Sequence, residues 1–246
     1  MTNIRPAATV VVLRDNDEQL EVLLLQRSRR GFAGGAWVFP GGAVDAADLA
    51  GRSAAEAARV AAVRECREEA SLHLAAEALL PIAHWLTPEG APKRFATHFF
   101  AVSAPPAPDV VVDGGEITDY RWAPAAALLT EHRRGALPLV PPTYVTLLQL
   151  SAWSDSASAL AGFARQGAPD FLPRMIARGD AYYFLYQDDA GYQDREPDCP
   201  GARHRCIMDA QGCHYERSLS GGPLGEGAAD AAAADSRQCG RGRELP

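Results

Sequence analysis

The chain has 246 residues, of which 47% are hydrophobic and 22% charged, and its formal net charge is −7. This length allows one large domain, or one domain with an appendage, and the composition is that of an ordinary globular protein. The negative charge argues against a nucleic-acid backbone as the main partner. The apolar run at residues 7–13 is too short to span a bilayer and lacks a signal-peptide cleavage pattern, so the expected location is the cytoplasm.

The cysteines are unevenly distributed along the chain. Cys66 is alone in the first 190 residues. The other four fall in the last fifth: Cys199, Cys206, Cys213 and Cys239. An odd, clustered set is no disulfide framework and indicates a reducing compartment. The late cysteines, with His204 and His214, match none of the usual zinc spacings, so we expect no zinc site there.

The first third of the chain predicts a β-hairpin, a glycine turn and a long helix. Apolar runs at residues 7–13 and 20–25 flank a polar link, which is typical of a hairpin. A short strand at 37–39 stops at Pro40-Gly41-Gly42, where glycines let the backbone turn and approach a ligand. After a loop at 43–52, Ser53 starts a helix that runs to about Ala70, with Glu56 at capping-box spacing.

The remainder of the chain predicts shorter elements. Helices are expected at 75–79, 124–132, 143–153 and 157–165, and strands at 82–86, 94–102, 117–122, 174–177, 182–186, 204–208 and 213–217. Beyond Ser220 the sequence is rich in Gly, Ala and Asp and has few apolar anchors. We therefore expect a disordered tail over residues 220–246. The isolated His73, His84, His98 and His132 are interpreted as packing or surface residues.

Glu65, Glu68 and Glu69 lie at positions i, i+3 and i+4 of the long helix, so they share one face. Their mutual repulsion weakens a helix by about 0.2–0.5 kcal/mol per pair, unless a dication such as Mg²⁺ or Mn²⁺ neutralises it. Taken alone, such a cluster is more often a solvated acidic face. The apolar positions expected to be buried on the opposite side of the helix are Val60, Val63 and Ala70.

Together these pieces resemble the signature of the Nudix hydrolase family: Gly, five residues, Glu, seven residues, then Arg-Glu-apolar-x-Glu-Glu-x-Gly-apolar. The matching pieces are Gly42, Glu56 and residues 64–72, which read RECREEASL. Thirteen residues, rather than five, separate Gly42 from Glu56, and Ser71 replaces the late glycine. Serine is a small change at a helix end. The eight-residue insertion falls in the loop that should deliver Glu56.

Other segments extend the resemblance to residues 6–155, and a weaker resemblance continues to residue 190. Residues 32–42 (FAGGAWVFPGG) are similar to the segment before the signature in the coenzyme A diphosphatase-like branch, which also tolerates insertions. Residues 85–88, 93–100 and 137–143 resemble later parts of that branch. One departure is Phe32, where the coenzyme A signature has a further arginine.

The resemblance implies an α/β fold: a Nudix-type α/β/α sandwich with a mixed β-sheet and extra C-terminal helices. On this basis we expect a Nudix hydrolase domain at 1–155, an extension packed on it at 156–219, and a flexible tail at 220–246. A small-molecule nucleoside diphosphate is the expected partner, with no nucleic acid and no membrane. The sequence leaves a homodimer open.

The resemblance also implies the members of the site. Mg²⁺ or Mn²⁺ is expected on Glu65, Glu68, Glu69 and the Gly42 carbonyl, with Arg64 orienting the carboxylates. The expected contacts to substrate phosphates come from Arg27, Arg94, Gly41 and Gly42. Cys66 takes an apolar slot of the signature and is expected to be a buried structural thiol, because no histidine pairs with it locally.

Two further carboxylates are left open as catalytic residues. Glu56 is fully explained as the capping partner of Ser53, and a helix that already includes it places it about 180° from Glu65. A helix that starts later lets it reach the site. Glu116, after Gly114-Gly115, is a candidate base or ligand carried by a loop.

The activity implied is metal-dependent hydrolysis of the diphosphate linkage in a nucleoside diphosphate conjugate, with coenzyme A or an acyl-CoA as leading substrates. ADP-ribose, nucleotide sugars and dinucleoside polyphosphates remain alternatives. A different class of function is a non-catalytic Nudix-fold module that binds a ligand. Such modules usually lack signature carboxylates, whereas Glu65, Glu68 and Glu69 are all present.

Overall fold

The computed structural model describes residues 4–16, 19–30, 34–104 and 108–218. The predicted disordered tail at 220–246 lies outside these residues. The strands are β1 (Ile4–Asn16), β2 (Gln19–Arg27), β3 (Trp37–Val38), β4 (Gly41–Ala43), β5 (Leu80–Leu86), β6 (Arg94–Ser103), β7 (Ile117–Ala123), β8 (Asp170–Phe171), β9 (Arg174–Arg178), β10 (Ala181–Leu185), β11 (His204–Asp209) and β12 (Gly212–Arg217). The helices are α1 (Ala46–Leu49), α2 (Ala54–Ala70), the 3-10 turn Ala76–Ala78, α3 (Ala125–Arg133), α4 (Pro141–Leu150) and α5 (Ser156–Gln166).

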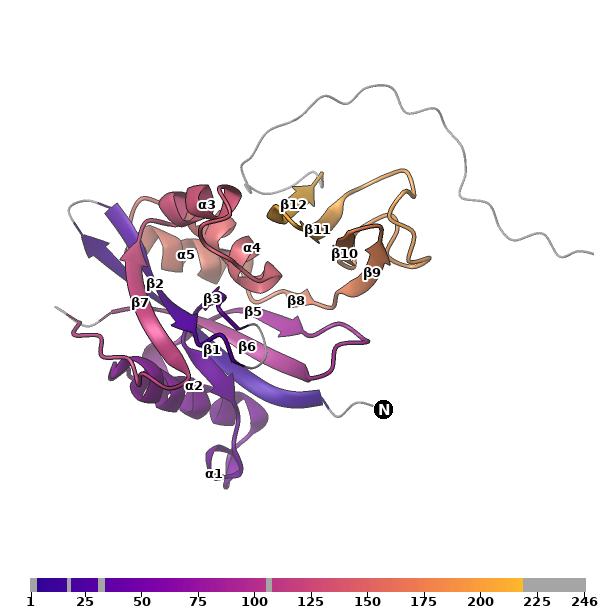
Figure 1. The fold of residues 1–246 in the computed structure, drawn as a ribbon. Helices are drawn as coiled ribbons and strands as arrows, with labels where there is room; N and C mark the ends of the chain where they lie inside the picture. The colour runs from indigo at the N-terminus through magenta and orange to yellow at the C-terminus, as the bar shows by residue number, and fades with distance from the viewer. Residues whose placement is uncertain (1–3, 17–18, 31–33, 105–107, 219–246) are drawn as a thin grey trace, which may run out of the picture.

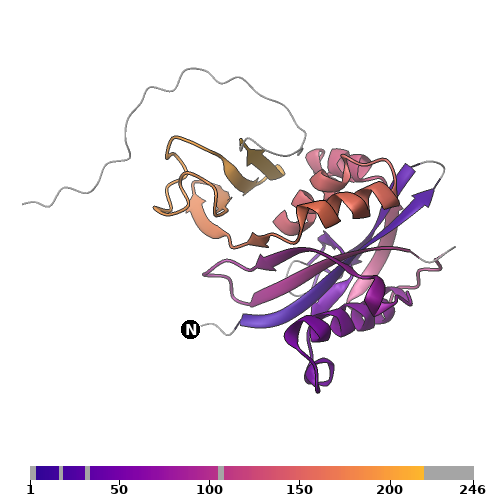
Figure 2. The ribbon, with the colours of Figure 1, turned by 180° about the vertical axis from the view of Figure 1, so that it is seen from behind.

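An eight-stranded mixed sheet forms the centre of the molecule (Figure 1). Its strand order is β3-β2-β1-β6-β5-β8, with β4 paired to β1 and β7 paired to β2. The β1–β6 and β5–β8 pairs are parallel, and the others are antiparallel. Helix α2 covers one face, while α3, α4 and α5 lie on the other (Figures 1 and 2). The predicted α/β/α sandwich with a mixed sheet is confirmed.

The predicted hairpin forms because the polar link between β1 and β2 lets two apolar runs pair in antiparallel register. The capping box at the start of α2 also forms, since the Ser53 and Glu56 side chains each bond to the backbone of the other. Ser71 ends the helix in the left-handed conformation (φ 57°), the position where the family signature has glycine. None of the described helices is long and apolar enough to cross a membrane.

The segment predicted as a loop at residues 43–52 contains secondary structure. Residues 41–43 form β4 by pairing with β1, in the register Ala7↔Ala43, Ala8↔Gly42 and Thr9↔Gly41. Residues 46–49 form the one-turn helix α1. At its start, Asp45 N donates a hydrogen bond to Asp48 Oδ2 at 2.9 Å. Both elements are missed because they depend on tertiary partners and are too short to show periodicity.

The buried face of α2 differs from the prediction. The helix packs on β1, β2 and β6 through four fully buried alanines, Ala57, Ala58, Ala61 and Ala62. Val60 and Val63 are only partly buried. Because the alanine side chain ends at Cβ, these four residues let the helix pack close to the sheet. Glu65 and Glu69 lie on the same side of the helix as the alanines. The expectation that the carboxylates point away from the buried face is therefore wrong for Glu65 and Glu69. Glu68 is half exposed, and Ala70 is buried as predicted.

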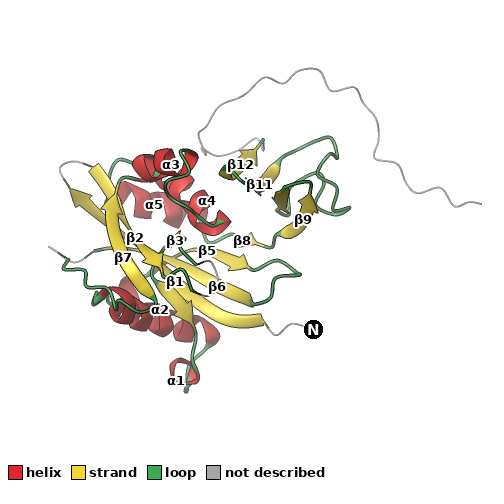
Figure 3. Ribbon diagram, viewed as in Figure 1, coloured by secondary structure: helices red, strands yellow, loops and turns green. Residues whose placement is uncertain are grey.

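The C-terminal segment adds to the sheet and forms a second, smaller sheet (Figure 3). Strand β8 extends the main sheet at β5, and β9–β12 form an antiparallel sheet in the order β12-β11-β10-β9. The Phe171 ring stacks on Trp85 of β5 at a centroid separation of 3.9 Å, and Tyr186 meets both rings edge-on. These aromatic contacts join the segment after residue 156 to the central sheet.

Candidate active site

The glycine turn is fixed to β1 by hydrogen bonds from both backbone and side chain. The Pro40 carbonyl accepts from Thr9 Oγ1 at 2.6 Å and from Val10 N at 2.9 Å. A Cβ at Gly41 would overlap the Ala8 carbonyl and the Thr9 side chain. Only glycine therefore allows the chain to pass this close to β1 and still turn.

Gly42 is in contact with Glu65 of α2. A Cβ at Gly42 would overlap the Glu65 carboxylate, so the missing side chain leaves the room this carboxylate occupies. The Glu65 side chain is 16% exposed. Burial raises the pKa of Glu65, and Glu68 adds like-charge repulsion, while the neighbouring Arg64 acts in the opposite direction.

Glu69 is the most buried carboxylate of the cluster, with 6% of the residue exposed. Its Oε2 accepts a hydrogen bond from Gly41 N at 2.8 Å. Burial raises the pKa of Glu69 to about 8, against the opposing effect of that hydrogen bond, and the charge on Glu65 raises it further. The glycine turn and α2 thus hold two carboxylates together in a partly desolvated place.

Arg64 links the helix to the segment that follows the glycine turn. Its guanidinium donates to Asp48 Oδ2 at 2.9 Å, to the Ala43 carbonyl at 2.9 Å, and to Glu65 Oε1 at 2.9 Å. It also donates to Glu68 Oε2 at 3.0 Å. The hydrogen bond from Arg64 lowers the pKa of Asp48, whose side chain is 5% exposed. Arg64 therefore fixes β4, α1 and α2 as one unit.

Asp48 is the site residue that the sequence reading missed. Five residues separate Asp48 from Gly42, as the Nudix signature requires between its glycine and its acidic residue. Glu56 instead satisfies the second interval of the signature, the seven residues before Arg64. In the structure Asp48 accepts a hydrogen bond from Arg64. The eight additional residues therefore lie between Asp48 and Arg64, after the acidic residue rather than before it. Counting forward from the glycine, and accepting aspartate for glutamate, identifies it from sequence.

Glu56 remains at the start of α2, away from the carboxylate cluster. Its Oε2 accepts from Ser53 N at 2.9 Å and from Ser53 Oγ at 2.7 Å. Nine helical residues separate it from Glu65, which corresponds to about 13 Å along the axis and a half-turn around it. The structure thus does not bring Glu56 to the other predicted site residues.

Arg27 and Glu116 form an ion pair beside the cluster. The Arg27 charge lowers the pKa of Glu69, and the Glu116 charge raises those of Glu65 and Glu69. The structure therefore brings these two predicted residues to the carboxylates. Arg94, at the start of β6, instead donates to the Thr87 carbonyl at 3.1 Å.

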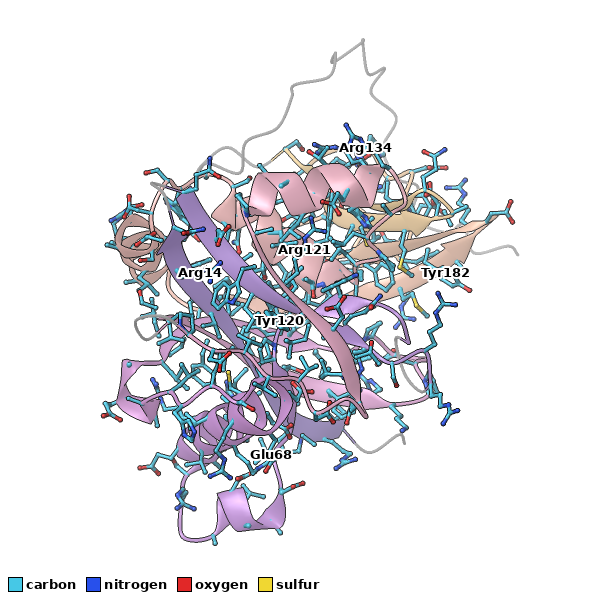
Figure 4. All side chains as sticks on the ribbon, turned by 60° about the vertical axis from the view of Figure 1, so that its left-hand side comes forward. Arg14, Glu68, Tyr120, Arg121, Arg134 and Tyr182 are labelled. Carbon is cyan, nitrogen blue, oxygen red and sulfur yellow. The ribbon has the colours of Figure 1, made fainter. Side chains whose placement is uncertain are left out.

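Glu68 and Cys66 have different environments on α2. The Glu68 side chain is 50% exposed, and Figure 4 labels it in the layer on the opposite side of the sheet from Arg134. Cys66 is fully buried, and burial raises the pKa of its thiol to about 12. A thiol with this pKa is a packing group rather than a nucleophile, as expected from the sequence.

Comparison with known proteins identifies the family. The family model for the NUDIX domain matches residues 3–141, more than half of the chain. The chain belongs to the Nudix hydrolase family. Its members hydrolyse pyrophosphate bonds, generally with divalent metals, in small nucleotide-derived substrates.

The chain is similar to solved structures to different degrees. The Nudix hydrolase from Alicyclobacillus acidocaldarius is 29% identical, with a TM-score of 0.60 over 65% of this chain and 97% of that one. A C. elegans Ap4A hydrolase is 22% identical, with a TM-score of 0.38 over 66% of this chain and 97% of that one. The NUDIX domain of Shewanella oneidensis NrtR, solved with ADP ribose, is 18% identical. Its TM-score is 0.45 over 60% of this chain and 86% of that one. No curated protein matches significantly.

The carboxylates of this Nudix hydrolase fit a divalent metal in the chemistry of their donor atoms. Among the described residues, no three His, Cys, Asp or Glu side chains lie close enough together to hold a metal ion. Arg64 donates to both Glu65 and Glu68. The donor set nevertheless suits Mg²⁺, which takes carboxylate and carbonyl oxygens. The buried Glu65 and Glu69 also repel each other, and a cation would relieve this repulsion.

We expect Gly42→Ala to lower stability and activity together, because the added methyl group must displace the Glu65 carboxylate. Thermal unfolding and turnover should both report the loss. Shortening Glu65 removes the overlap, so Gly42→Ala should cost much less stability in a Glu65→Ala background. An equal cost in both backgrounds would show that the two residues are not in contact.

Proposed function

We propose that this Nudix hydrolase is a metal-dependent diphosphatase that cleaves the diphosphate linkage of a nucleoside diphosphate conjugate. Glu65, Glu68, Glu69 and the Gly42 carbonyl are the proposed ligands of Mg²⁺ or Mn²⁺. The observation that carries the proposal is the Glu69 carboxylate, which is buried beside Glu65 at the glycine turn with a pKa of about 8. A buried carboxyl group whose pKa is raised in this way, beside a second carboxylate, indicates a position where a bound cation would stabilise the ionised form.

The residues around the carboxylates have distinct roles in this proposal. A bound dication would supply a Lewis acid and neutralise the diphosphate oxygens. Arg64 holds Glu65 in place and is itself fixed by the buried Asp48. Arg27 contributes a cation for the substrate phosphates on the Glu69 side of the cluster. Glu116, paired with Arg27, accepts the proton of the attacking water.

The proposed substrate is coenzyme A or an acyl-CoA, on the basis of the sequence resemblance at residues 32–42. ADP-ribose, nucleotide sugars and dinucleoside polyphosphates are the alternatives within the same chemistry. A cytoplasmic location is part of the proposal, because Cys66, Cys206 and Cys213 are free thiols.

The experiment is a substrate screen of the purified protein with Mg²⁺ and with Mn²⁺. Coenzyme A, ADP-ribose, NADH and dinucleoside polyphosphates are incubated separately, and phosphate-containing products are separated by chromatography. We expect metal-dependent cleavage between the two phosphorus atoms, which EDTA abolishes. Binding without cleavage of any of these compounds would indicate the non-catalytic module instead.

A further inference from the structure

A row of residues crosses the central sheet from the active site to the C-terminal segment. The strand registers pair Gly42 with Ala8, Ala8 with His98, His98 with His84, and His84 with Asp170. Residues paired directly across strands project from the same face of a sheet. A Cβ on Gly42 would point at Glu65 of α2, so both histidines lie on the face that carries the carboxylates.

The two imidazoles form a pair of rings on this face, here called the imidazole shelf (His84 and His98). Their centroids are 4.6 Å apart with an interplanar angle of 32°. The His84 side chain is 29% exposed, and His98 is also only partly buried. His84 Nδ1 lies 3.0 Å from Asp170 Oδ1, which fixes the orientation of the ring.

Two alanines flank the imidazole shelf, and the Phe100 ring lies 6.3 Å from His98 on the same strand. On the same face, Ala8 lies between Gly42 and His98, and Ala96 precedes His98 by two residues in β6. In the described part of the chain, α2 ends short of the β5–β6 hairpin, as Figures 1 and 2 show. Burial and the adjacent His84 lower the pKa of His98, so its ring is neutral at neutral pH.

The distance from the shelf to the carboxylates matches one nucleotide. His98 is two strands away from Gly42, about 10 Å at the usual strand spacing. An extended nucleoside 5′-monophosphate has about this length, so its nucleobase lies at the imidazoles when its phosphate is at Gly42. Neutral aromatic side chains are the groups on which bases stack.

We propose that His84 and His98 form the platform on which the nucleobase of the substrate stacks, an inference that rests on the proposed diphosphatase function. Asp170 is a positioning residue that acts through His84. It belongs to β8, outside the family match at residues 3–141. The C-terminal segment of this protein thereby completes the substrate site.

The test compares two probes that differ only in the base, AMP and ribose 5-phosphate. Their affinities are measured by calorimetry on the full chain with Mg²⁺ present, which would hold the probe phosphate at the carboxylates. Stacking is worth about tenfold in affinity or more, so the wild type should prefer AMP by that factor. His98→Ala should bind both probes equally, and His98→Phe should restore the preference. His73→Ala, an exposed histidine beyond the end of α2, is the matched control and should behave as wild type.

Asp170 provides a second variant that spares the shelf itself. Asp170→Ala should reduce the AMP preference, and Asp170→Asn, which keeps an oxygen acceptor for His84, should retain most of it. The proposal is overturned if the wild type binds the probes equally, or if His98→Ala keeps the full preference. Hydrolysis with an unchanged KM in His98→Ala would contradict the shelf and leave the diphosphatase function intact. A base preference without hydrolysis of any substrate would contradict only the function.

Discussion

Glu69→Gln should reduce the rate of diphosphate hydrolysis by roughly a hundredfold or more while the fold persists. Glutamine has the same shape, and its amide oxygen can still accept from Gly41 N, so the buried contact survives. It lacks the negative charge that a dication requires. Steady-state kinetics with saturating Mg²⁺ measures the loss, and circular dichroism checks the fold. Wild-type turnover in this variant would remove Glu69 from the proposed ligand set.

The same variant should change how stability depends on pH. The pKa of Glu69 rises from 4.5 in the unfolded chain to about 8 in the fold, so the folded state retains a proton that the unfolded state has lost. The metal-free wild type should therefore lose stability relative to Glu69→Gln as pH rises from about 4.5 to about 8. At its steepest the loss is roughly 1.4 kcal/mol per pH unit. Chemical denaturation at several pH values measures it.

Asp48→Ala should lower both stability and turnover, in contrast to Glu56→Ala. Asp48 is buried on Arg64, and removing it takes away the most buried acidic partner of Arg64, which keeps Glu65 and Glu68. A hydrogen bond between charged groups contributes about 1.5–3 kcal/mol. Arg64 then loses its anchor to α1, so Glu65 is held less firmly. Glu56 is an exposed capping residue, and its loss should affect helix stability slightly and turnover not at all.

The paired variants decide which acidic residue has the signature role. Urea denaturation gives the stability of each, and kcat at saturating metal gives the catalytic effect. Asp48→Asn, which keeps the shape and one oxygen, should lie between wild type and Asp48→Ala. A large drop in kcat for Glu56→Ala with none for Asp48→Ala would reverse the assignment.

Local pattern was sufficient to predict much of the fold. The β1–β2 hairpin follows from two apolar runs around a polar link, and the start of α2 follows from the spacing of Ser53 and Glu56. Each is specified by neighbours in sequence. The grouping of Glu65 and Glu69 is likewise local, because helical geometry places residues four apart on one face.

Long-range contacts account for what the sequence did not predict. The buried side of α2 consists of alanines, which a search for large apolar residues passes over in favour of Val60 and Val63. The pairing of Asp48 with Arg64 spans an insertion. The alignment of His98 with Gly42 depends on the registers of two strand pairs, which single-sequence periodicity does not specify.

Titration of the metal-free protein with Mn²⁺ tests the central claim most directly, because it measures the site without relying on a substrate. Calorimetry should show binding to the wild type and to Glu56→Gln with equal affinity. Binding should be weaker by roughly tenfold or more in Glu65→Gln and in Glu69→Gln. Equal Mn²⁺ affinity in all four proteins would contradict the assignment of these carboxylates as metal ligands.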